Sequence, residues 1–327
     1  MSETNDIFDV TILGAGPVGM YGAYYAGFRR LKMKLIDSLT EVGGQITALY
    51  PEKDIYDVAG FPRIRGKDLV RALADQMNQY EPTLALGEKA MGLTRREDGL
   101  LEIRTDKQVH LTRVLLIAGG IGLFTPRRYA DESINKYEWK GLYYVMTDPH
   151  IYQDKRVLVS GGGDSAVDWA LHLHRIARDV AIIHRRDEFR AHEDSVHKMR
   201  QAVKVLTPYV LKTLEGDNKV ERAIITNTKT KQDEVFECDM VLGCLGFIAN
   251  AGPIREWGLE LINDGVKVNI RMETSIPGVY AAGDISQYEG KPKIISVGFG
   301  EAAVAINNAS VYIDPQKRIF PGHSSGH

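Results

Sequence analysis

Two short apolar runs of the chain are each followed by a glycine-rich turn and then by a segment with helical periodicity. The run at residues 8–13 leads into Gly14-Ala15-Gly16-Pro17-Val18-Gly19, and the run at residues 156–160 leads into Gly161-Gly162-Gly163-Asp164-Ser165-Ala166. A buried strand, a glycine turn and a helix in this order are typical of a dinucleotide-binding unit. The pattern therefore predicts an α/β fold with two Rossmann-like dinucleotide-binding domains.

The glycines of such a turn have different tasks. The first allows the tight turn, the second lets a pyrophosphate approach the backbone, and the third, or Ala166 in the second turn, permits close packing of helix on strand. The N-terminus of the following helix offers unpaired N–H groups to a phosphate. Two ordinary glycine turns are the alternative. We expect contacts from Gly14, Gly16, Pro17 and Gly19 in the first turn and from Gly161, Gly163, Asp164 and Ser165 in the second.

The strand that follows each turn ends differently in the two units. Residues 32–37 end in Asp37, 23 residues after Gly14, where a carboxylate would bind the ribose of an adenine nucleotide. In the second unit the corresponding strand ends in His184, Arg185 and Arg186, with Arg190 further on. Arginine suits a 2′-phosphate because it is always charged and offers a bidentate fork. We therefore expect NADPH there; a turn aspartate and a solvated basic turn are the alternatives.

The remaining pattern predicts further elements around these turns. A glycine loop holds Gly43, Gly44 and Gln45, whose backbone and amide can approach a ligand. Helical periodicity covers residues 66–80, a hairpin covers 91–95 and 100–105, and residues 114–120 read as a buried strand. Residues 274–284 form a strand that ends in Gly283-Asp284, and a helix is expected over 297–312.

Composition narrows the class of protein. The chain has 327 residues and a formal net charge of -2, which favours neither nucleic acid nor an anionic membrane as a partner. We see no signal peptide and no apolar run of membrane-spanning length, and expect a cytoplasmic protein. Cys238 and Cys244 read as parts of one strand, about 20 Å apart, too far for a disulfide. His172 and His174 are two apart on a helix and cannot chelate together, so no metal is expected.

Four blocks together resemble thioredoxin reductase. They are the turn at residues 14–19, Gly43-Gly44-Gln45, the turn at 161–166 with the run at 184–191, and Ala281-Ala282-Gly283-Asp284. The resemblance implies a homodimer in which an NADPH-binding domain, residues 121–249, is inserted into an FAD-binding domain. The FAD-binding domain would comprise residues 1–120 and 250–327, with a C-terminal tail at 314–327.

Two departures make the resemblance more specific. Residues 143–149, where thioredoxin reductases carry a Cys-x-x-Cys, contain no cysteine, and the tail extends past the usual final helix. This combination resembles the bacterial thioredoxin-reductase-like ferredoxin/flavodoxin–NADP⁺ reductases. That family implies flavin stacking by Tyr50 on one face and by His323 on the other, with Ser324 nearby. It also implies FAD contacts from Asp37, Gly44, Gln45, Ala90, Phe124, Gly283, Asp284 and Ser325. On composition alone the tail would be read as a loose end.

The resemblance implies an enzyme that transfers electrons between NADP(H) and ferredoxin or flavodoxin through FAD. Without a dithiol to take both electrons, the flavin would pass them on singly. An NADPH-dependent flavoprotein that reduces a small disulfide, a quinone or an iron chelate is an alternative. A non-catalytic sensor of the two nucleotides is another.

Overall fold

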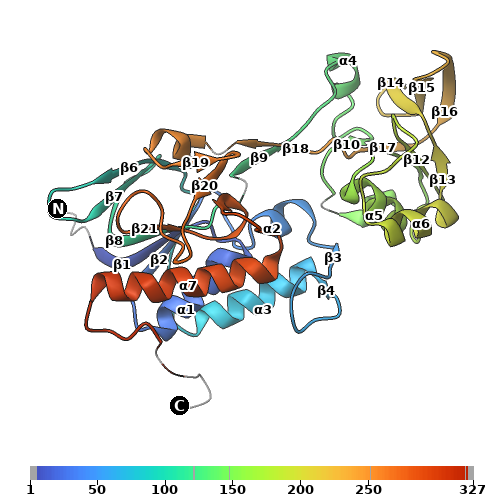
Figure 1. The fold of residues 1–327 in the computed structure, drawn as a ribbon. Coiled ribbons are helices and arrows are strands. Elements are labelled where there is room, and N and C mark those ends of the chain that lie inside the picture. The colour runs from blue at the N-terminus through green and yellow to red at the C-terminus, as the bar shows by residue number, and fades with distance from the viewer. Residues whose placement is uncertain (1–5, 121, 147, 251, 321, 323–327) are drawn as a thin grey trace. The chain divides into compact units, whose positions relative to one another are not determined.

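The computed structural model describes residues 6–120, 122–146, 148–250, 252–320 and 322. The chain divides into two compact units, Met1–Leu123 together with Ala249–His327, and Phe124–Ile248 (Figure 1). The chain passes between them in β9 (Leu123–Pro126) and β18 (Phe247–Asn250), which pair with each other. The first unit is therefore discontinuous in sequence.

The first unit is built on a sheet in the order β5-β2-β1-β8-β7-β6, with β21 paired to β8. The strands β1, β2, β5, β8 and β21 run parallel, whereas β6 and β7 are antiparallel to their neighbours. Leu13 lies opposite Ile36 and Ile117, and Ile117 lies opposite Ala281. The first glycine turn and the Gly283-Asp284 turn therefore share one edge of the sheet. The strands span Thr83–Leu86 (β5), Met33–Asp37 (β2), Ile7–Leu13 (β1), Val109–Ile117 (β8), Leu101–Thr105 (β7), Ala90–Arg95 (β6) and Val279–Ala281 (β21).

Three helices cover one face of this sheet: α1 (Pro17–Phe28), α3 (Gly66–Asn78) and α7 (Ile295–Ile313) (Figure 1). Gly22 lets α1 approach the sheet closely, because a Cβ there would lie only 3.1 Å from Leu116 of β8. The buried face of α3 presents Leu69, Leu73 and Met77, which follow helical spacing. The smaller elements of the unit are α2 (Gln45–Leu49), β3 (Asp54–Ile55), β4 (Ile64–Arg65), η2 (Gly252–Glu256), β19 (Leu261–Ile262), β20 (Gly265–Lys267), η3 (Gly283–Ile285) and β22 (Ser286–Gln287).

The second unit contains a parallel sheet in the order β10-β17-β11-β12-β13 and an antiparallel sheet in the order β14-β15-β16. The parallel strands span Leu142–Tyr143, Met240–Gly243, Arg156–Ser160, Asp179–Ile183 and Lys204–Leu206, and the antiparallel ones span Tyr209–Glu215, Arg222–Asn227 and Asp233–Glu237. Its helices are α4 (Glu132–Asn135), η1 (Pro149–Tyr152), α5 (Asp164–Leu173) and α6 (Glu193–Ala202).

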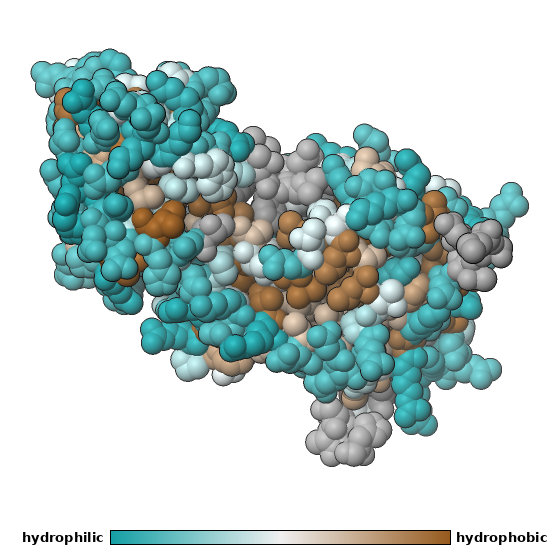
Figure 2. Space-filling view, turned by 180° about the vertical axis from the view of Figure 1, so that it is seen from behind, coloured by the Kyte–Doolittle hydropathy of each residue, from teal (hydrophilic) through white to brown (hydrophobic). Residues whose placement is uncertain are grey.

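On the face shown in Figure 2, hydrophilic residues surround exposed hydrophobic patches. Among the described residues, no helix combines the length and the apolar character that crossing a bilayer requires.

Candidate functional site

The glycines of the first turn differ in the space that the surrounding protein leaves for a side chain. Gly14 has a φ of +105°, and a Cβ there would lie 2.5 Å from the Ala118 carbonyl oxygen. A Cβ at Gly19 would lie 1.8 Å from the Gly14 carbonyl oxygen. At Gly16, in contrast, the nearest atom to a Cβ would be 3.9 Å away, in Gly44. Packing therefore demands glycine at 14 and 19, whereas the space above Gly16 is free for a ligand.

The start of α1 fits an anion. Its N-cap residue, Gly16, has no side chain to bond the first N–H groups, Pro17 occupies the first turn, and that turn carries no acid. Uncapped N–H groups and the helix dipole together favour a phosphate at this position.

Asp37 is fixed beside this turn by the backbone. Its Oδ2 accepts a hydrogen bond from the Ala15 N–H at 2.6 Å, and its Oδ1 accepts one from the Leu39 N–H at 2.8 Å. Burial raises the pKa of the Asp37 carboxyl, and the backbone hydrogen bonds act in the opposite direction. The carboxylate thus stands at the carboxyl end of β2 next to the glycine turn, where a ribose would lie.

The loop at residues 43–45 closes over the same turn. The Gly43 N–H donates to the Ala15 carbonyl at 2.8 Å. Gly44 has a φ of +57°, and a Cβ there would lie 2.9 Å from the Cα of Gly16. Gln45 begins α2, and a Cβ at Gly120 would lie 3.0 Å from its Nε2. The amide of Gln45 is therefore held near the end of β8.

Tyr50 and Asp284 lie close enough to influence each other. Tyr50 follows α2 and is half-buried; burial, helped by the charges of Asp284 and Asp57, raises its pKa to about 12. Asp284 lies in η3, directly after β21. Burial raises its pKa, and Lys293 and Lys291 oppose the shift. The charge of Asp284, which follows β21 at the same sheet edge as the glycine turn, thus acts on the Tyr50 phenol.

Asp57 is a site residue that the sequence did not reveal. Its Oδ2 accepts the Ile295 N–H at 2.8 Å, and its carbonyl accepts the Ser296 hydroxyl at 2.8 Å. It caps α7 from 238 residues upstream, so no local capping pattern marks it. For the same reason α7 begins at Ile295, two residues before the predicted start. A hollow of about 550 Å³ lies here, lined by residues 56–62 with Ile294 and Ser296.

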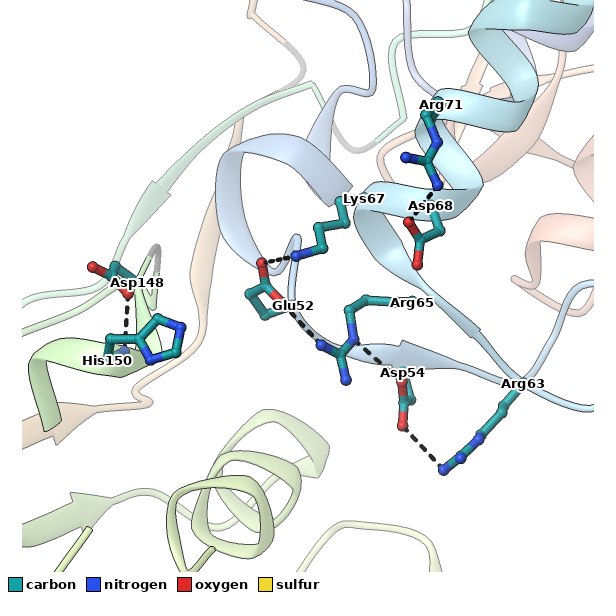
Figure 3. Close-up of polar contacts among 9 residues, drawn as sticks. All are labelled: Glu52, Asp54, Arg63, Arg65, Lys67, Asp68, Arg71, Asp148 and His150. Atoms are coloured by element: carbon teal, nitrogen blue, oxygen red, sulfur yellow. Dashed lines mark hydrogen bonds and ion pairs between the residues drawn. The ribbon is translucent and has the colours of Figure 1, made fainter. Parts of the chain in front are cut away.

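Charges on the loop after Tyr50 are paired with one another (Figure 3). Glu52 accepts from Lys67 at 2.8 Å and from Arg65 at 3.3 Å, and the hydrogen bond from Lys67 is the main cause of its lowered pKa. Arg63 lies 3.7 Å from Asp54. The basic side chains of the β3–β4 hairpin are therefore paired with nearby carboxylates.

The other residues predicted to contact the first nucleotide are less informative. Ala90 is half-buried at the start of β6. Phe124 lies in β9, and its side chain is not described. His323, Ser324 and Ser325 lie outside the described residues. Their roles stay predictions.

The second glycine turn has its own close contacts. A Cβ at Gly161 would lie 2.5 Å from the Cys244 carbonyl oxygen, and one at Gly162 would lie 2.3 Å from the His184 ring. α5 begins at Asp164, and its N-cap residue, Gly163, provides no side-chain cap. The predicted His184 therefore packs directly on the turn.

The basic segment after β12 is tied to this turn by its backbone. The Arg190 N–H donates to the Gly162 carbonyl at 2.7 Å, and the His192 N–H donates to Asp164 Oδ1 at 3.1 Å. Arg185, Arg186 and Arg190 are exposed. Burial and then the charges of Arg185 and Arg186 lower the pKa of His184, which favours its neutral form. Three guanidinium-bearing residues thus belong to one segment fixed beside the turn.

The two cysteines do not form a disulfide, as predicted. They flank β17, one before it and one after it. Cys238 is fully buried, and burial raises its pKa to about 12, which keeps the thiol protonated.

Two glycine turns of this kind, each in its own α/β unit, define the class of oxidoreductases that bind two dinucleotides. Residues 8–309 match the family described as pyridine nucleotide-disulphide oxidoreductase. The chain belongs to this family and, within it, to the ferredoxin–NADP reductases of thioredoxin-reductase-like fold. The predicted family and fold class are both confirmed.

The relatives and solved structures agree with this membership. The chain is 49% identical to "Ferredoxin--NADP reductase 2" of Shouchella clausii, covering 99% of each chain. It is 49% identical to "Ferredoxin--NADP reductase" of Geobacillus kaustophilus, covering 99% of this chain and 98% of the relative. Lactococcus lactis thioredoxin reductase matches with a TM-score of 0.80 at 26% identity, covering 94% of this chain and 99% of that one. The T. acidophilum thioredoxin reductase matches with a TM-score of 0.81 at 26% identity, covering 95% of this chain and 99% of that one.

Proposed function

We propose that this protein is an FAD-dependent ferredoxin–NADP⁺ reductase that transfers electrons between NADP(H) and ferredoxin or flavodoxin. Full-length relatives with that name and the family membership support the activity. We assign FAD to the discontinuous unit and NADP(H) to the other unit, whose bounds are residues 124–248. We expect it to act in the cytoplasm.

One observation carries the assignment of FAD to the first unit. The glycine turn, Asp37 and Asp284 all lie at the carboxyl edge of one sheet, Gln45 lies near Gly120 after β8, and no atom lies closer than 3.9 Å to a Cβ built at Gly16. Open α/β sheets bind their ligands at that edge. The residues present therefore fit the cofactor.

The chain's residues would hold and orient the flavin nucleotide, which when bound accepts hydride from NADPH and releases electrons one at a time. Asp37 would bind the adenosine ribose, and the N-terminus of α1 would bind the pyrophosphate. Asp284 would fix the ribityl chain, and Tyr50 would cover one face of the ring and exclude water.

The cysteines argue against a dithiol route. The two cysteines form no disulfide, and Cys238 is buried with a raised pKa. A reductase that passes two electrons to a disulfide through its own dithiol would need a redox-active pair. Single-electron carriers therefore suit this chain better than small disulfides.

The C-terminal tail supports a homodimer. Arg29, 8% exposed, donates to the carbonyls of Arg318 at 2.8 Å and Ile319 at 3.0 Å, and also to Asn307 at 2.8 Å. Asn307 lies about 18 Å along α7 from Ile295. Ile295 is at the end of α7 that is near the proposed flavin site. His323 follows Ile319 by four residues, or about 14 Å of extended chain. This length is shorter than the distance from Asn307 to Ile295, which favours a site on another chain, and we propose that each tail covers the flavin site of a second copy.

The activity is tested with purified protein and a bacterial ferredoxin. We expect one FAD per chain, released by denaturation, and reduction of ferredoxin that NADPH supports better than NADH. A protein that cannot be reconstituted with FAD, or that binds it without reducing any one-electron carrier, would contradict the proposal.

A further inference from the structure

A buried ion pair lies directly behind the Gly283-Asp284 turn. Lys291 Nζ lies 2.8 Å from Glu301 Oε1, and the two side chains are only 2% and 4% exposed. Lys291 precedes α7 and Glu301 lies within it. Removing two charges from water is costly, so such a pair persists only where further hydrogen bonds satisfy it.

Those further hydrogen bonds converge on Gly283. Glu301 Oε2 accepts the Gly283 N–H at 2.7 Å, and the Lys291 ammonium donates to the Gly283 carbonyl at 2.6 Å. Ser286 donates to Glu301 Oε2 at 3.1 Å and accepts from Lys291, while Tyr288 donates to Glu301 Oε1 at 2.7 Å. Both backbone polar groups of the residue before Asp284 are thus held by the pair.

Gly283 has little freedom to move in any other way. It has a φ of +77°, and a Cβ there would lie 3.1 Å from Val18 in the first turn of α1. A Cβ at Gly298, in the first turn of α7, would lie 2.5 Å from Val18 and 3.4 Å from the Cα of Gly283. The turn is therefore packed between the starts of α1 and α7, and the hydrogen bonds from the ion pair fix the orientation of the Gly283 N–H and carbonyl.

We propose that Glu301 and Lys291 are positioning residues that fix the Gly283-Asp284 turn, and with it the Asp284 carboxylate, for the bound flavin. This inference rests on the proposed function, because it assumes FAD at this edge. The pair is neutral as a whole, so replacing one member changes both the hydrogen bonds of the turn and the local field. Loss of Glu301 makes the field more positive, and loss of Lys291 makes it more negative.

The test uses the full-length holoprotein with Glu301→Gln and Lys291→Met, measuring the Kd for FAD and the flavin midpoint potential. We expect each variant to raise the Kd for FAD at least tenfold. The potential should rise in Glu301→Gln, because added positive charge stabilises the reduced, anionic flavin, and should fall in Lys291→Met. General loosening of the fold would not move the potential in opposite directions. The control pair, Glu260→Gln and Lys267→Met, changes an exposed ion pair of the same unit and should leave both quantities unchanged.

A double variant guards against misfolding. Lys291→Met with Glu301→Leu replaces both members of the pair by apolar side chains, so that no buried charge is left without its counter-charge. It should keep its far-UV spectrum and bind FAD at least tenfold more weakly, since the hydrogen bonds from the pair to Gly283 are then lost. FAD binding within twofold of the wild type in this variant, or potentials that shift in the same direction in the two single variants, would overturn the inference. If the wild type itself bound no FAD, the proposed function would fail instead.

Discussion

Gly16 and Gly19 belong to one turn but are glycine for different reasons. Gly19→Ala would place a methyl group 1.8 Å from the Gly14 carbonyl oxygen. It should lower the free energy of unfolding by about 2 kcal/mol or more, as overpacking does. Gly16→Ala meets no protein atom closer than 3.9 Å. It should leave the apoprotein stable to within about 1 kcal/mol while weakening FAD binding at least tenfold.

Urea denaturation of the two apoproteins and FAD titration distinguish these effects. Equal losses of stability in the two variants would mean that the space above Gly16 is not reserved for a ligand.

The arginines after β12 carry the preference between nicotinamide cofactors. A charge-assisted hydrogen bond to a phosphate contributes roughly 1.5–3 kcal/mol. Replacing Arg185 and Arg186 by Ala should therefore raise the KM for NADPH at least tenfold and change the KM for NADH little. Arg175→Ala, at another exposed arginine of the same unit, is the matched control. Similar increases for the two cofactors would remove the arginines from 2′-phosphate recognition.

The strands β11 and β17 are joined by a side chain as well as by their ladder. Asp239 accepts from the Arg156 N–H at 2.8 Å and from its guanidinium at 2.7 Å, and the side-chain hydrogen bond is the main cause of its lowered pKa. A carboxyl with a lowered pKa stabilises the fold above its unfolded pKa of about 3.9 and loses that effect as pH falls.

Asp239→Asn should therefore lower the free energy of unfolding by about 1–2 kcal/mol at pH 7. The difference in the free energy of unfolding between variant and wild type should close as the pH falls below about 4. Urea titrations at both pH values measure it, with Asp194→Asn at an exposed α6 ion pair as the control. A gap that persists unchanged at low pH would show that the charge is not responsible.

Elements that follow from a local sequence pattern were predicted well. Features that depend on residues far away in the sequence were not. The two strand–turn–helix units follow from local pattern, and α3 was expected from the spacing of Leu69, Leu73 and Met77. The start of α7 was misplaced because its cap, Asp57, comes from another part of the chain. Glu301 gave no signal, because a buried acid in a helix looks like any surface acid until Lys291 is placed beside it.

At the scale of the whole molecule, the proposal concerns the C-terminal tail and the dimer. If Arg29 anchors it, Arg29→Met should alter the flavin absorbance spectrum in the same way as truncation after Ile319. Arg30→Met, at the exposed neighbouring arginine, should not. Sedimentation should give twice the chain mass for the wild type. A monomer with full activity and an unchanged spectrum after truncation would show that the tail has no part in the site.

The central claim is that electrons pass from NADPH through FAD to a one-electron carrier without any cysteine. The most direct measurement is anaerobic stopped-flow absorbance on the wild type and on the Cys238→Ser, Cys244→Ser double variant. NADPH should bleach the flavin band rapidly in both, and oxidised ferredoxin mixed in afterwards should restore it, consuming two ferredoxins per flavin. A double variant that is bleached by NADPH but no longer reoxidised by ferredoxin, or a wild type that NADPH does not bleach, would contradict this account.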